Sequence, residues 1–295
     1  MMPKRMTLLT MRSGEDYTLG VKLDKGILDV KKANQALKSK APATMDDLIR
    51  RGDQGLTELV ERAVSSGKGL VEESKVEFGP CVTNPEKIIC VGLNYAKHAS
   101  ETKNPLPQFP ILFNKYNNAL NYHRGTIRVS GIPAKDFDYE AELVIVMGKR
   151  TANVSEAEAL SYVFGYCNGN DFSVRDLQMR TTQWMIGKTC DGFAPIGPYL
   201  VTADQVPNPN NLKIESSVNG EVRQSSNTND MIFNCAQLVS YTSKLMTLEP
   251  GDIIFTGTPE GVIIGYPKEK RVWLKPGDEV TTTIEKLGEL KFSLT

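Results

Sequence analysis

Histidine is scarce in this sequence: His98 and His123 are the only two in 295 residues. Histidine is the side chain whose ordinary pKa lies closest to neutrality. A mechanism that needs a base at neutral pH must therefore use one of these two imidazoles, or a carboxylate or lysine with a shifted pKa.

Paired cysteine motifs are also absent. No two of the five cysteines show the C-x-x-C spacing found in many zinc and redox sites. An odd, dispersed set in a chain of this length predicts reduced thiols, and we therefore expect a cytoplasmic protein. The cysteines are Cys81, Cys90, Cys167, Cys190 and Cys235.

The chain has neither a long apolar run nor an excess of charge of one sign. A membrane helix needs about 20 apolar residues, and the amino-terminal segment is interrupted by Ser13, Gly14 and Glu15, unlike a secretory signal. Lysine plus arginine and aspartate plus glutamate each number 35. Because no overall field favours a polyanion or an anionic surface, we expect neither a nucleic-acid nor a membrane partner.

The pattern of elements predicts two domains. Residues 5–30 alternate in short stretches, which is typical of an antiparallel strand unit. Residues 44–66 have helical spacing interrupted near Gly52 and Gly55. The glycine-rich connection that follows places a boundary between residues 68 and 84. We therefore predict a small N-terminal α+β domain over residues 1–75 and a catalytic domain over residues 76–295.

From Ile88 onward the sequence is rich in short strands separated by glycine and proline. Asn219-Gly220, between two alternating runs, predicts a two-residue hairpin. Helices are expected only at about 155–162, 172–183 and 234–246. The predicted fold class is α+β and β-rich, a sandwich or barrel-like roll with peripheral helices.

Acidic residues precede the most apolar of the predicted strands, in the segment 136–148. Because side chains alternate along a strand, Glu140 and Glu142 point to the same face, with Asp138 before them. Both faces are apolar beyond Glu142, which indicates a strand buried on both sides. Carboxylates at the mouth of such a strand repel each other and need a cation to remain ionised.

Asp171, which ends the run FGYCNGND, is a third candidate ligand. Three carboxylates without histidine or cysteine favour a hard cation, Mg²⁺ or Mn²⁺ with Ca²⁺ as an alternative, over zinc. The competing interpretation is that Glu140 and Glu142 are solvated residues at the end of an edge strand.

His98 and Glu101 lie three residues apart, which places both on one side of a helical turn. A carboxylate beside an imidazole fixes its tautomer and raises its basicity, which suits a general base that activates water. A surface pair at the start of a short helix is the alternative, and it is the commoner case.

Four further residues are candidates on weaker grounds. Lys188 follows a glycine in a segment that lacks the first glycine of a nucleotide-binding loop, and it could instead stabilise a developing enolate. The turn FTGTPEGV offers the backbone N–H of Gly257 and the hydroxyl of Thr258 to a carboxylate. Gln178, on a predicted helix, could orient a water. An exposed lysine, a plain tight turn and a surface glutamine would explain the same residues.

Taken together, these segments resemble the fumarylacetoacetate hydrolase family over roughly residues 86–292. The resemblance is carried by six stretches in the same order, GLNYAKHASE, DYEAELVIVMGK, FGYCNGNDFSVRDLQ, IGKTCDGFAPIGPYLV, VNGEVRQSSNTNDMIF and LEPGDIIFTGTPEGV.

The resemblance implies a mixed β-roll, commonly dimeric, with Mg²⁺ or Mn²⁺ in its site. The first 70 or so residues then correspond to the small extra domain of longer members. By position, the family's metal ligands fall on Glu140, Glu142 and Asp171, and its histidine–glutamate dyad falls on His98 and Glu101. Its lysine falls on Lys188, its water-positioning glutamine on Gln178, and its carboxylate-binding threonine on Thr258; Gly257, Lys115 and Arg175 complete the expected substrate-binding set.

One segment departs from the family pattern. After the strand PILF, members often have lysine followed by proline and small residues, whereas this chain has FNKYNNALNYHRG. Lys115 is kept and the three residues after it differ. The distal part of the substrate pocket is therefore not assigned by the resemblance.

The function expected from these residues is cleavage of a C–C bond in a small 2-oxo acid, of the acylpyruvate type, through a metal-stabilised enolate. His98, oriented by Glu101, would activate the water. Decarboxylation of oxaloacetate, and hydration or isomerisation of an unsaturated 2-oxo diacid, use the same enolate and remain alternatives. A non-catalytic binding protein on the same scaffold is the alternative of another class.

Overall fold

The strands form two main sheets and one short two-stranded sheet in a computed structural model that describes residues 1–295. The larger sheet has the order β4-β3-β2-β1-β13-β11-β10-β16-β5-β6, and β7 also pairs with β13. The second has the order β15-β14-β17-β18-β8, and the third contains β12 and β9. The predicted strand-rich α+β class is confirmed. The strands are β1 (Thr7–Ser13), β2 (Asp16–Leu23), β3 (Gly26–Asp29), β4 (Leu70–Val71), β5 (Ile88–Gly92), β6 (Ile111–Lys115), β7 (Leu120–Asn121), β8 (Gly125–Ile127), β9 (Phe137–Asp138), β10 (Ala141–Met147), β11 (Val163–Asn170), β12 (Ser173–Val174), β13 (Ala194–Thr202), β14 (Lys213–Val218), β15 (Glu221–Asn227), β16 (Ile253–Phe255), β17 (Glu279–Ile284) and β18 (Gly288–Leu294).

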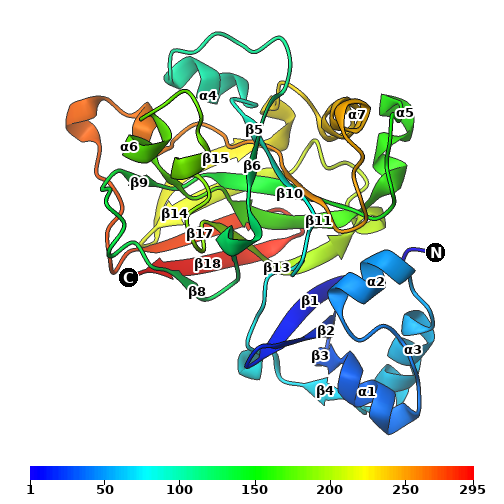
Figure 1. Ribbon diagram of the computed structural model, residues 1–295. Helices are drawn as coiled ribbons and strands as arrows, with labels where there is room; N and C mark the ends of the chain where they lie inside the picture. The colour runs from blue at the N-terminus through cyan, green and yellow to red at the C-terminus, as the bar shows by residue number, and fades with distance from the viewer.

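The α-helices are short and lie around the sheets (Figure 1). The predicted helix at 234–246 is α7, and the one at 155–162 is α5 followed by a 3-10 turn. The helix expected over 172–183 is shorter, because its first residues pair with β9 as strand β12. No helix is both long and apolar enough to cross a bilayer. The helices are α1 (Val30–Leu37), α2 (Met45–Arg51), α3 (Leu56–Ser66), α4 (Ala96–Glu101), α5 (Glu156–Ala159), α6 (Arg175–Gln178) and α7 (Cys235–Leu245).

The N-terminal segment combines an antiparallel strand unit with three helices, drawn in blue in Figure 1. Gly52 and Gly55 have φ values of 76° and 90°, and they separate α2 from α3 as the sequence predicted. Strand β1 pairs antiparallel with β13, with Leu8 opposite Leu200. The N-terminal strands therefore extend the larger sheet, and the domain boundary near residue 75 stays a prediction.

Strand β10 lies in the interior of the larger sheet, between β11 and β16. All seven of its residues are buried. Val144 and Val146 belong to one apolar core, and Leu143 and Ile145 belong to the other. The strand is therefore buried on both faces, and Glu142 is not at a solvated sheet edge.

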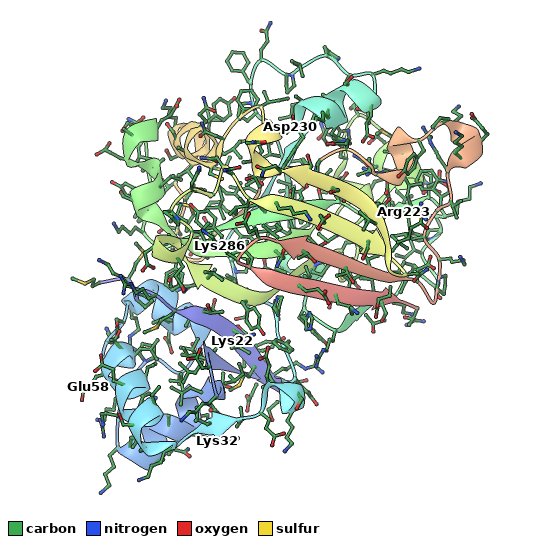
Figure 2. The ribbon with its side chains drawn as sticks, turned by 180° about the vertical axis from the view of Figure 1, so that it is seen from behind. Lys22, Lys32, Glu58, Arg223, Asp230 and Lys286 are labelled. Atoms are coloured by element: carbon green, nitrogen blue, oxygen red, sulfur yellow. The ribbon has the colours of Figure 1, made fainter.

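The second sheet covers one side of the larger sheet, as seen from behind in Figure 2. Arg223 lies on β15, and Lys286 lies in the turn that joins β17 to β18. The Asn219-Gly220 hairpin is confirmed: both residues have positive φ, 51° and 83°, and they connect β14 to β15. Strand β18 and the short strands β4, β7 and β12 were not predicted, and the single strand expected over residues 136–148 is divided into β9 and β10.

Candidate active site

A single cavity of about 1000 Å³ contains most of the predicted functional side chains. Its walls come from α4, from β6, from the start of β10, from α6 and from the segment that follows β16. Figure 1 shows α4 and α6 above one end of the larger sheet, where these elements meet. Residues separated by up to 180 positions, from Val91 to Arg271, thus surround one space.

The three candidate metal ligands lie together in this region. Glu140, Glu142 and Asp171 each offer a carboxylate oxygen, and these oxygens lie within 4.8 Å of one another. Pairing of β10 with β11 sets Glu142 opposite Gly169, and the N–H of Asp171 donates to the carbonyl of Glu140 at 2.9 Å. The exposed fractions of the three residues are only 6%, 1% and 0%. Backbone pairing therefore holds three buried carboxylates at one point.

Two cations neutralise one side of this cluster. Lys188 Nζ lies 2.8 Å from both Glu140 Oε2 and Asp171 Oδ2, and Arg175 Nη2 lies 2.8 Å from Glu140 Oε1. Burial alone would raise the pKa of Glu140, but Lys188 and Arg175 outweigh it and lower that pKa to about 2. Burial likewise opposes the charge on Lys188, yet Asp171 and Glu140 raise its pKa. Glu140 and Lys188 are therefore ionised at neutral pH.

Glu142 has no such partner. Its Oε2 accepts the N–H of Gly257 at 2.7 Å, and it forms no ion pair. Burial, reinforced by Asp171 and Glu140, raises the pKa of Glu142 well above its ordinary value. A third buried carboxylate without a compensating charge fits the position of a metal ligand, because a bound cation would supply that charge. An all-oxygen donor set suits Mg²⁺, Mn²⁺ or Ca²⁺.

This arrangement predicts how pH affects the metal-free protein. Glu142 takes up a proton more readily when folded than when unfolded, so its contribution to stability is present at acid pH and is lost as pH rises through the raised pKa. In chelator, the melting temperature of the wild type should therefore fall between pH 5 and pH 8 relative to that of Glu142→Gln. Differential scanning calorimetry measures this difference. A melting temperature that changes with pH by the same amount in both proteins would contradict the prediction.

Lys115 has a different environment from the one expected of a substrate-binding residue. Its side chain is fully buried and does not line the cavity. The ammonium lies 2.6 Å from Asp171 Oδ1 and donates to the carbonyls of Phe172, Phe193 and Lys188. Lys115 therefore fixes the backbone around Asp171 and Lys188.

Replacing Lys115 with methionine should destabilise the protein. The substitution keeps an unbranched side chain but removes the cation 2.6 Å from Asp171 Oδ1 and leaves three carbonyls without their donor. Removing one partner of a buried ion pair costs about 3–5 kcal/mol. Urea denaturation measures the free energy of unfolding, and Lys68→Met, at an exposed lysine, is the matched control. A loss no larger than that of the control would contradict this role.

His98 and Glu101 form the expected pair on α4. His98 Nδ1 lies 2.8 Å from Glu101 Oε1, and both residues line the cavity. Because a carboxylate only accepts, Nδ1 carries the proton and Nε2 of the neutral imidazole remains a base. His98 is 6% exposed. The pair is therefore partly desolvated within the cavity.

The other predicted substrate-binding groups are already hydrogen-bonded. Thr258 lines the cavity, but its hydroxyl donates to the carbonyl of Ala141 and accepts from Gln224, both at 2.9 Å. The Gly257 N–H is bound to Glu142. Arg175 donates to Gln178 Oε1 at 2.9 Å, which leaves the amide nitrogen of Gln178 available in the cavity. Their roles toward substrate stay predictions.

Asp138 does not join the carboxylate cluster, although it lies two residues before Glu140. It belongs to the separate strand β9, and the regular alternation with β10 is broken at the junction. Its side chain pairs with Arg175 Nε at 2.9 Å.

The outer part of the cavity contains residues that the sequence did not single out. Three of them are basic and form no ion pair: Lys103, Lys268 and Arg271. Trp184 packs edge-on against Phe113 in the same wall, with ring centroids 5.5 Å apart. No pattern placed these loops near the site, because they lie outside the predicted strands and helices.

The model of the fumarylacetoacetate (FAA) hydrolase C-terminal domain matches residues 87–295, more than half of the chain. The chain belongs to the fumarylacetoacetate hydrolase family. The predicted resemblance is thereby confirmed, and the match begins where the strand-rich part of the sequence begins.

Relatives of this family member include enzymes. Oxaloacetate tautomerase Fahd2a, mitochondrial, of Rattus norvegicus is 42% identical over 264 residues, which cover 89% of this chain and 82% of the relative. Oxaloacetate tautomerase fahd2, mitochondrial, of Xenopus laevis is 39% identical and covers 97% and 89%. The solved structure of maleylpyruvate hydrolase from Sphingobium sp. SYK-6 with manganese(II) and pyruvate is 30% identical, covers 98% and 99%, and has a TM-score of 0.79.

The expectation of a cytoplasmic protein is contradicted. The relatives from rat, cattle and Xenopus laevis are named as mitochondrial proteins. All five cysteines are free in the structure, as predicted. Unpaired cysteines, however, do not identify one compartment.

Proposed function

We propose that this protein is a divalent-metal-dependent enzyme that interconverts the enol and keto forms of a small 2-oxo diacid, with oxaloacetate as substrate. The observation that carries the proposal is one cavity lined by Glu140, Glu142, Lys188 and the His98–Glu101 pair, with the carboxylate of Asp171 directly behind Lys188 and within 4.8 Å of the two glutamates. Two relatives with 42% and 39% identity that are named oxaloacetate tautomerases support the choice of substrate.

The reaction moves one proton. In the enol-to-keto direction, the hydroxyl at C2 loses its proton, the C2–C3 double bond becomes single, and C3 gains a proton. A cation held by Glu140, Glu142 and Asp171 would supply a Lewis acid for the oxygen at C2. Lys188, fixed by two carboxylates at 2.8 Å, adds a positive charge beside this oxygen.

His98 is the group suited to carry the proton. Glu101 holds the Nδ1–H, so Nε2 can accept the proton that the C2 hydroxyl loses and then donate it to C3 of the substrate. His98 is buried, whereas the side chain of Glu101 is 21% exposed. One nitrogen would thus move the proton from the oxygen at C2 to C3.

Hydrolysis of an acylpyruvate is the second candidate. The cavity of about 1000 Å³ is larger than a four-carbon diacid requires, and the maleylpyruvate hydrolase structure, with manganese and pyruvate, is 30% identical. In this reaction His98 Nε2 takes a proton from water, and the water oxygen bonds to the distal carbonyl carbon. The C–C bond then breaks, its electron pair forms the enolate, and protonation yields pyruvate and a carboxylic acid.

A substrate panel tests the proposal. The protein is stripped with chelator, reloaded with Mg²⁺ or Mn²⁺, and given oxaloacetate or acetylpyruvate. Malate dehydrogenase consumes only keto-oxaloacetate, so the slow phase of NADH oxidation reports tautomerisation, while lactate dehydrogenase reports pyruvate. A metal-dependent acceleration of the slow phase without pyruvate supports tautomerisation. Pyruvate from oxaloacetate would indicate decarboxylation instead, and pyruvate only from acetylpyruvate would indicate hydrolysis.

Homodimerisation, implied by the family resemblance, is part of the proposal. Size-exclusion chromatography with light scattering, compared with the chain mass of 32.6 kDa, tests it.

A further inference from the structure

Glu101 contacts more than His98. Both of its carboxylate oxygens accept the backbone N–H of Gly261, with distances of 3.2 Å to Oε1 and 3.1 Å to Oε2. Gly261 belongs to the segment that follows β16, and 160 residues separate it from Glu101. The carboxylate that orients the imidazole is thus itself held by a distant part of the chain. We call residues 261–265 the Glu101 seat.

Gly265 gives this seat its space. A Cβ at position 265 would lie 2.6 Å from Cδ of Glu101 and 2.7 and 2.8 Å from its two oxygens. The φ of Gly265 is outside the left-handed region, so its backbone accepts any residue. Glycine at 265 therefore leaves the room that the Glu101 carboxylate occupies, and a side chain there would displace this carboxylate, which is the end of a flexible side chain.

Gly261 is required for a different reason. Its φ is +99°, and a Cβ there would lie 2.2 Å from the carbonyl oxygen of Arg223 on β15. This backbone conformation directs the N–H of Gly261 at Glu101.

Asp138 anchors the seat to the catalytic cluster. Its Oδ1 and Oδ2 accept the N–H groups of Ile263 and Ile264 at 2.9 and 3.0 Å. The same carboxylate pairs with Arg175, which also contacts Glu140. Asp138 is fully buried. The seat is therefore fixed relative to the three carboxylates, and a side chain at 265 should move Glu101 and not the backbone.

We propose that Gly265 is a positioning residue, whose missing side chain leaves the room in which Glu101 sets the tautomer and orientation of His98. The inference rests on the proposed function only in taking His98 as the base. The proposal adds the Glu101 seat, which follows β16, to the residues that position His98.

Gly265→Ala tests the proposal through kinetics. We expect kcat to fall about 10- to 100-fold, the usual cost of losing an outer-shell orienting contact, with little change in KM or in Mn²⁺ affinity. In a Glu101→Ala background the same substitution should change nothing further, because the group it displaces is gone. Gly79→Ala is the matched control: its backbone is also unrestricted, and the added Cβ would meet the Tyr17 ring at 2.8 Å, outside the cavity.

A spectroscopic measurement separates this inference from the proposed activity. With only two histidines, the ¹⁵N signals of the imidazoles are simple, and those of His98 are the ones lost in His98→Ala. Wild type and Gly79→Ala should show the Nδ1–H tautomer of His98, and Gly265→Ala should show a loss of that preference. An unchanged tautomer in Gly265→Ala, or an equal kinetic loss with and without Glu101, would overturn the role of Gly265. Absence of turnover in the wild type would overturn the proposed function and leave the NMR result to decide this one.

Discussion

Glu142→Gln is expected to lose about a thousandfold in turnover at a fixed Mn²⁺ concentration. The substitution preserves the shape of the side chain and removes one of three clustered carboxylates. It removes the only one of the three that no side-chain cation compensates. Lewis-acid assistance is worth several kcal/mol, and each 1.36 kcal/mol corresponds to a factor of ten in rate.

The measurement pairs metal binding with catalysis. Titration with Mn²⁺, followed by the paramagnetic resonance of the free ion, gives the affinity, and the malate dehydrogenase assay gives the rate. Glu156→Gln, at an exposed residue of α5, is the control and should match the wild type in both. Wild-type turnover by Glu142→Gln after its metal has been removed would exclude the carboxylate cluster as the reacting centre.

The carboxylate site was predictable because strand alternation places Glu140 and Glu142 near each other whatever the remaining fold is. The approach of Asp171 depends on the β10–β11 pairing, in which Ala141 lies opposite Asn170. Local alternation cannot supply this pairing. Resemblance to a family over several segments in the same order could predict this pairing, because the contacts of the family fold are inherited together with its residues.

Strand alternation predicted the wrong direction for the Asp138 side chain, because the strand is not continuous. Asp138 falls in phase with Glu140 in the sequence, but it lies on β9 and turns to Arg175 and to the seat. A backbone irregularity of one or two residues changes which way a side chain points, and composition does not reveal it.

Lys115 shows a second limit of sequence reasoning. A lysine at the end of a strand is ordinarily exposed. This one is buried because carbonyls from residues 172, 188 and 193 converge on it. These carbonyls are 57 to 78 positions away in the chain. Only the folded structure therefore shows that the charge of Lys115 stabilises the backbone.

His98→Ala should separate the reactions that share the enolate. Tautomerisation and acylpyruvate hydrolysis both need proton transfer by Nε2, and a positioned acid–base group contributes about 10²- to 10⁴-fold. Both rates should fall by that factor. In the decarboxylation of oxaloacetate, loss of carbon dioxide leaves the enolate directly and needs no base. Any decarboxylase activity of the protein should therefore survive the substitution. Mn²⁺ affinity should not change, because His98 is not part of the carboxylate cluster.

The control for this prediction is Ser100→Ala, on the solvent side of the same helix, which tests for disturbance of α4 itself. Tautomerisation and decarboxylation are measured on the same metal-loaded preparation, so a general loss of folding would lower both rates together. Selective loss of tautomerisation, with decarboxylation and metal binding retained, assigns the proton transfer to His98. Equal retention of both reactions would show that another group moves the proton, and Gln178 and Lys188, which line the same cavity, would be the next to test.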